Sequence, residues 1–145
     1  MFRMNPRAEI AAIAFAALLL CAPAALAETM TFKGDLKASS EVPPNDSKGT
    51  GTVTATYDTA TKALTYTVEY SGLTGAATAA HFHGPAEPGA NAGVAVPVQG
   101  ALTSPIKGTA TLTDAQAADL QAGKFYFNVH TAANKGGEVR GQMTK

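Results

Sequence analysis

Short runs in which apolar and polar residues alternate recur along this chain, and no other feature constrains its fold as strongly. In residues 50–57, for example, Val53, Ala55 and Tyr57 alternate with threonines. Successive side chains of a β-strand point to opposite faces of a sheet, so this pattern predicts strands with one buried face. We expect such strands at residues 31–36, 50–57, 64–70, 79–83, 94–98, 106–113, 125–131 and 138–143.

One short helix is expected between the sixth and seventh strands. Thr113 is a suitable N-cap, Gln116 follows three residues later as in a capping box, and Gly123 ends the segment. The sequence predicts an all-β fold: an antiparallel, Greek-key-like sandwich of two sheets or a flattened barrel, with about eight strands and one short helix. The expected core residues are Phe32, Leu64, Tyr66, Val68, Leu112, Phe125, Phe127 and Val129.

The N-terminal segment has the three parts of a secretory signal peptide. Two arginines precede an apolar stretch at residues 10–21, and residues 25–27 form an Ala-x-Ala cleavage site. We therefore expect a signal peptide at residues 1–27, a single domain at residues 28–145, and a periplasmic or secreted location.

Removal of that segment changes the composition in ways that bear on function. It takes away Cys21, the one cysteine of the chain, so the domain must be stable without disulfides. It leaves nine basic and ten acidic residues, a balance that argues against nucleic-acid binding, which needs a basic surface. The apolar stretch is too short for a stable membrane span. A lipid anchor on Cys21 is disfavoured by the bulky Leu20 before it.

The three histidines of the chain are placed where they can meet. His81 and His83 are two residues apart in one predicted strand, so their side chains share a face. His130 alternates with the apolar residues of a later strand and so lies on the face away from the core. If these strands are neighbours, three imidazoles converge and can hold Cu(II) or Zn(II) with an open position. The alternative is that the three side chains are separately solvated or bonded to backbone.

Other catalytic signals are weak. The domain has no cysteine nucleophile, no nucleophile elbow and no phosphate-binding loop. The acidic residues lie in or beside turns, where a solvated role in turn formation is expected for Glu138 among others. We name no catalytic residue, and the sequence favours a binding protein over an enzyme.

Three segments in order carry a resemblance to a known family. They are residues 32–36 with 41–44, residues 80–86 followed by Gly93, and residues 125–131 with 136–142. Together they resemble the CHRD (chordin-repeat) domain over nearly the whole of residues 29–143. The resemblance implies a small exported β-domain. The family is named from an extracellular antagonist of growth factors, but nothing in this sequence implies that it binds one.

A second, weaker similarity is to the copper side of Cu,Zn superoxide dismutase. By this similarity His81, His83 and His130 are copper ligands, and Arg140 is an anion guide or a residue that supports a ligand. The chain lacks that enzyme's bridging histidine, its zinc ligands and its disulfide. The alternative for Arg140 is a surface ion pair or a cross-strand contact, for example with Glu138 or Glu69.

Three functions follow from these observations. The first is an exported domain that binds a single copper ion, or zinc, through three histidines. The second is a metal-free extracellular interaction module that uses the loop at residues 84–93 or a sheet edge. The third is a copper-only redox enzyme similar to superoxide dismutase. The distances among the three imidazoles separate the second function from the other two.

Overall fold

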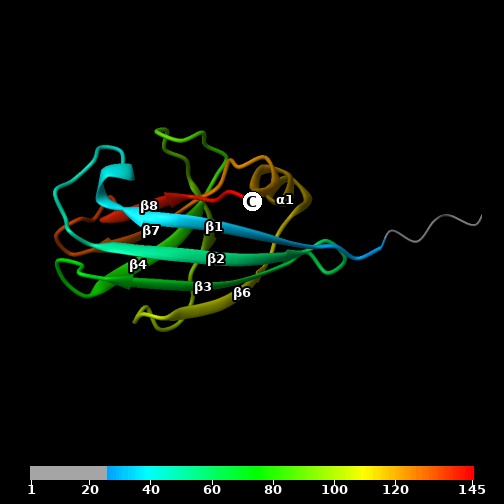
Figure 1. Cartoon of the computed structure of the whole chain (residues 1–145), viewed down its shortest axis with the longest axis horizontal. Helices are drawn as coiled ribbons and strands as arrows, with labels where there is room; N and C mark the ends of the chain where they lie inside the picture. Colours follow the sequence, from blue (N-terminus) through cyan, green and yellow to red (C-terminus); the bar gives the residue numbers. More distant parts are fainter. Residues whose placement is uncertain (1–25) are drawn as a thin grey trace, which may run out of the picture.

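The computed structural model describes residues 26–145 (Figure 1). The signal peptide predicted at residues 1–27 lies outside the described residues except for its last two positions. Within residues 26–145, no helix is long and apolar enough to cross a membrane.

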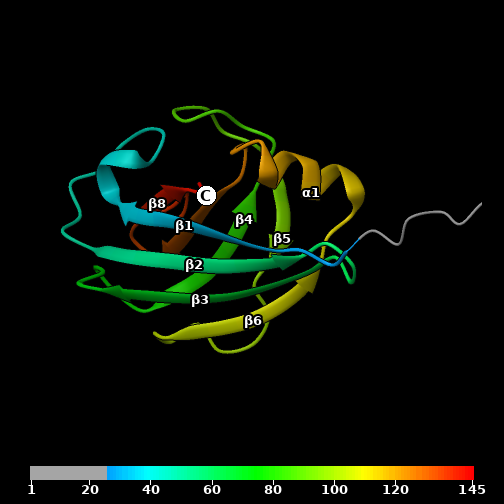
Figure 2. The same cartoon turned by 45° about the vertical axis from the view of Figure 1, so that its right-hand side comes forward.

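All eight strands belong to one antiparallel sheet with the order β5-β4-β7-β8-β1-β2-β3-β6. The strands are β1 (Thr29–Lys37), β2 (Thr50–Asp58), β3 (Ala63–Ser71), β4 (Ala77–His83), β5 (Val94–Pro97), β6 (Ile106–Thr111), β7 (Tyr126–Thr131) and β8 (Val139–Gln142). The sheet curls into a nearly closed barrel whose edges are β5 and β6 (Figure 2). The predicted all-β class is confirmed, with one continuous sheet in place of two separate ones.

The alternation of residues determines which side of each strand faces the barrel interior. Val53 pairs with Val68, and Ala55 with Tyr66, so their side chains meet inside the barrel, while Thr54 lies outside. The turn between β2 and β3 is stabilised by Asp58, whose Oδ1 accepts hydrogen bonds from the backbone N–H groups of two following residues at 2.9 and 2.8 Å.

The eight predicted core residues are all buried, which confirms that prediction. Phe82 stands near the centre of the core, with its ring edge-to-face to Tyr66 at 5.1 Å and to Phe127 at 4.7 Å. Such aromatic pairs add about 0.5–1.5 kcal/mol each beyond the burial of their area. The aromatic cluster therefore holds β4 and β7, the strands that carry the histidines, against β3.

The short helix α1 (Asp114–Gln121) forms as the sequence predicts. The Thr113 side chain accepts a hydrogen bond from the Gln116 N–H, and the Gln116 side chain accepts one from the Thr113 N–H. The Gln116 amide also donates to the carbonyl of Ala95 in β5. Leu120 is fully buried, so the helix packs against the core beside the edge strand. A 3₁₀ turn, η1 (Ala38–Ser40), was not predicted.

The outer face of β7 and β8 is buried as well, which the alternation did not predict. The loops at residues 38–49 and 84–93 lie on the same side of the barrel as β8 (Figures 1 and 2). Tyr126, Asn128 and Arg140 point away from the core, yet each is only 2% exposed. These strands therefore carry two buried layers, an apolar one inside the barrel and a polar one outside it.

Glu138 belongs to this outer layer, and the expected solvated turn role is wrong. Its side chain is fully buried and accepts hydrogen bonds from the Ser47, Thr74 and Thr131 hydroxyls and from the Thr74 N–H. Burial alone would raise its pKa. The donated hydrogen bonds outweigh burial and lower the pKa of Glu138 to about 2 from 4.5.

Glu138→Gln should lower the free energy of unfolding at pH 7 by about 3 kcal/mol, the linkage equivalent of that pKa change. The stabilisation is present above pH 4.5 and is lost as the pH falls toward 2. Urea unfolding at pH 7 and pH 3 should therefore show a large pH effect in the parent and a smaller one in the variant. Glu69→Gln, on an exposed strand position, is the control. A Glu138→Gln change below about 0.5 kcal/mol would contradict this account.

Candidate metal centre

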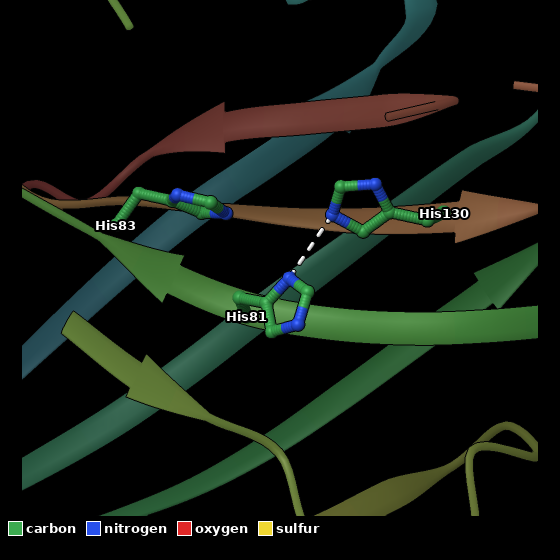
Figure 3. A group of neighbouring side chains, drawn as sticks. All are labelled: His81, His83 and His130. Carbon is green, nitrogen blue, oxygen red and sulfur yellow. Dashed lines mark hydrogen bonds between the residues drawn. The ribbon is translucent and has the colours of Figure 1, made fainter. Parts of the chain in front are cut away.

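The three histidines come from two neighbouring strands. His81 and His83 lie on β4 and His130 on β7, and the two strands pair antiparallel so that Ala79 is opposite His130 and His81 is opposite Asn128. All three imidazoles lie outside the barrel core and point toward one another (Figure 3). If one ring nitrogen is taken from each histidine, the three nitrogens all lie within 4.8 Å of one another. We call these three residues the His cluster.

The spacing of the His cluster is close to that of a metal site. Nδ1 of His81 is 3.1 Å from Nε2 of His130. Two nitrogens bound to one ion at about 2 Å each lie at most about 4 Å apart. The widest separation in the cluster therefore has to close by less than about 1 Å to bring all three nitrogens onto one ion.

Backbone carbonyls set the orientation of two of the rings. Nδ1 of His83 is 3.0 Å from the Ala92 carbonyl oxygen, and Nδ1 of His130 is 2.9 Å from that of Lys135. A carbonyl oxygen only accepts, so each Nδ1 carries the proton. In the neutral ring Nε2 then has the free lone pair, which is how metal-binding histidines are commonly held.

Burial favours the neutral form of two of the histidines. Burial lowers the pKa of His81, and positive charge on the other two imidazoles lowers it further. Burial also lowers the pKa of His83, although the hydrogen bond to the Ala92 carbonyl opposes this. Neutral imidazole is the form that binds a metal, so both rings are ready to coordinate near neutral pH.

Asn128 lies at the centre of the His cluster, and sequence analysis missed it. Its Oδ1 is 3.0 Å from Nε2 of His83 and 2.9 Å from Nε2 of His130. The available signal was its position in the predicted strand, two residues before His130 and on the same face.

Arg140 is buried, so the surface ion pair considered for it is wrong. Its guanidinium donates hydrogen bonds to Asn91 Oδ1 at 2.9 Å and to the Ala90 carbonyl. The guanidinium carbon lies 3.4 Å from the centroid of the Tyr126 ring, which in turn stacks on His83 at 4.7 Å. Arg140 thus supports His83 through Tyr126.

The loop at residues 84–93 is fastened over this polar layer. Asn91 Nδ2 donates to the Val42 carbonyl at 3.0 Å, which ties the loop to the segment after η1. The Ala92 N–H donates to the Tyr126 hydroxyl at 3.2 Å. Because Ala92 also holds the His83 ring, the loop fixes the position of one member of the His cluster.

Glu41 is a second residue that sequence analysis missed. It is 5% exposed, and its Oε1 has no hydrogen-bond partner in the described part of the chain. Burial raises the pKa of Glu41 to about 7, against the opposing effects of the Arg140 charge and the Asn128 amide. Its carboxyl group therefore lies beside the amide that contacts two histidines.

Comparison with known proteins identifies one family. The family model of the CHRD domain matches residues 32–143. This range contains the His cluster together with Glu41, Asn128 and Arg140. No match was found among curated proteins or among solved structures. The similarity to superoxide dismutase stays a prediction.

Proposed function

The chain belongs to the CHRD domain family, and on this premise we propose that its domain binds one metal ion through His81, His83 and His130. The observation that carries the proposal is the convergence of three ligand atoms within 4.8 Å. The carbonyl groups that direct two Nε2 lone pairs into the same space support it. Three neutral nitrogen ligands leave further coordination positions for a fourth donor or for solvent.

Copper is the metal we propose, with zinc as the alternative. Imidazole nitrogen suits both ions, and the general order of affinities places Cu(II) above Zn(II) for one set of donors. This order favours Cu(II) at the site when both ions are present.

We propose a binding role in preference to a redox enzyme. An anion guide needs a guanidinium that is free to face the metal. The Arg140 guanidinium is engaged by Asn91, by the Ala90 carbonyl and by the Tyr126 ring. This supports a positioning role for Arg140, acting on His83 through the stacked Tyr126 ring.

Export is part of the proposal. CHRD domains occur as extracellular-type modules, and the segment at residues 1–27 has the pattern of a cleavable signal peptide. We propose that the domain at residues 28–145 acts in the periplasm or outside the cell, and that it binds its metal ion there. The intact mass of the exported protein should correspond to a chain that starts at Glu28; a lipidated Cys21 would contradict this.

Calorimetric titration of the purified protein at pH 7.5 tests the function. We expect saturable binding of one Cu(II) per chain, and displacement of Zn(II) by Cu(II) in competition. The control is the variant in which all three histidines are replaced by alanine, which should not show the saturable phase. If the parent binds neither ion one-to-one, the proposal is contradicted. The metal-free interaction module is then the favoured function.

A further inference from the structure

We propose that Asn128 is a fourth donor of this metal centre through its side-chain oxygen, and that Glu41 holds the amide in the orientation this requires. The inference rests on the proposed metal binding and adds to it. It makes the donor set three imidazole nitrogens and one amide oxygen.

The first argument is that three acceptor atoms face one another. Nε2 of His83 and Nε2 of His130 carry lone pairs, because the Nδ1 atoms of both rings are protonated against backbone carbonyls. Asn128 Oδ1 lies 3.0 and 2.9 Å from these two nitrogens. Three lone pairs in contact without a hydrogen between them repel one another, and a cation placed among them turns that repulsion into attraction.

The second argument is the bond geometry that these distances imply. Two donors at 2.9–3.0 Å from each other, each about 2 Å from one ion, subtend an angle of about 90°. The 3.1 Å between His81 Nδ1 and His130 Nε2 gives a similar angle. Right angles among nitrogen and oxygen donors are typical of Cu(II), whereas Cu(I) prefers soft sulfur ligands. The site should therefore favour the oxidised ion.

The third argument concerns the orientation of the amide. The amide oxygen of Asn128 lies toward the two imidazoles, and its NH₂ group lies on the side of Glu41. The amide nitrogen, a donor, thus faces the carboxyl group of Glu41, an acceptor. Glu41 Oε1 is buried and has no hydrogen-bond partner in the described part of the chain. A donor such as the Asn128 NH₂ group beside it is therefore stabilising.

Gly137 provides the room for this contact. A Cβ atom at that position would overlap the Glu41 carboxylate and would lie 2.7 Å from Asn128 Nδ2. Its backbone φ of +128° also lies in the region that favours glycine. The backbone, the carboxylate and the amide thus meet at one point beside the His cluster.

The test compares Cu(II) binding and the EPR spectrum of the parent with those of Asn128→Leu, Asn128→Asp and Glu41→Gln. We expect Asn128→Leu to lose about 10- to 100-fold in Cu(II) affinity and to change the parallel copper hyperfine splitting, with little change in Cu(I) affinity. Glu41→Gln should lose about tenfold, as is typical when the partner of a ligand is removed. Glu69→Gln, on an exposed strand position, should match the parent.

Asn128→Asp keeps the test decisive if the leucine variant fails to fold, because it preserves side-chain shape. It should retain one-to-one binding, with a spectrum altered by the exchange of an amide for a carboxylate oxygen. If the parent binds Cu(II) and every Asn128 variant that folds has the parent's spectrum and affinity, Asn128 is not a ligand, and the three-histidine proposal stands. If the parent itself does not bind, both proposals are overturned.

Discussion

His130→Ala should weaken Cu(II) binding by more than about a hundredfold. The residue supplies one of three nitrogens and is the only one from β7. Loss of a ligand should exceed the 10- to 100-fold effect typical of residues that merely support a ligand. The chain has no fourth histidine to replace it. Competition titration with a chelator of known affinity measures the change.

Lys135→Ala is a matched control for this variant. It removes a neighbouring side chain but keeps the backbone carbonyl that accepts from His130 Nδ1, so affinity should stay within about twofold. Replacement of both His130 and His81 should reduce the binding free energy by less than the sum of the two single reductions, because ligands of one site act together. If the His130→Ala variant binds Cu(II) as tightly as the parent does, His130 is not a ligand.

The three single histidine variants should differ in stability, although all three side chains lie off the core. His81 and His130 are partly exposed, so their replacement should leave the fold nearly unchanged. His83 is 8% exposed, stacks on Tyr126 and bonds to Ala92. Its replacement therefore also removes packing and a buried hydrogen bond, and affinity losses must be compared at temperatures where each variant is folded.

Cu(II) affinity should fall as the pH drops from 7 to 5. Protons compete with the metal for imidazole, and each ligand that titrates contributes up to tenfold per pH unit below its pKa. Burial lowers the pKa of His81 and of His83 below the ordinary 6.5, so their contributions begin below that pH and near-full affinity should persist at pH 7. Competition titrations at half-unit intervals give the profile.

The pH at which the affinity begins to fall separates the metal site from isolated histidines at the surface. A site in which two ligands have lowered pKa values keeps its affinity to a lower pH than three ordinary imidazoles would. An affinity that is constant from pH 7 to pH 5 would show that imidazole nitrogen is not the ligand. The calorimetric proton release on binding provides an independent count of the histidines that give up a proton.

Local periodicity explains why the fold and the His cluster could be predicted. Alternation in β2 and β3 separates Val53 and Val68 from the exposed threonines, and the structure places the two valines opposite each other. The same rule puts His81 and His83 on one side of β4 and His130 away from the core on β7. To predict that the three imidazoles converge, one must also know that β4 pairs with β7, and the sequence alone left that pairing open.

The polar layer around the cluster could not be predicted because it depends on loops that close from far along the chain. Glu41 precedes Asn128 by 87 positions, and Asn91 contacts Arg140 across 49. Alternation marks Asn128 and Arg140 as residues away from the core, which is correct, but it does not show that the segments at 38–49 and 84–93 cover them. A strand face is solvated or buried according to what folds over it.

X-ray anomalous scattering from crystals of the protein loaded with Cu(II) tests the central claim most directly. Data collected on either side of the copper absorption edge identify the element and its position. The account predicts one peak per chain, about 2 Å from a nitrogen of each of His81, His83 and His130. A fully loaded crystal whose only copper peaks lie away from these three imidazoles, or contact fewer than two of them, would contradict it.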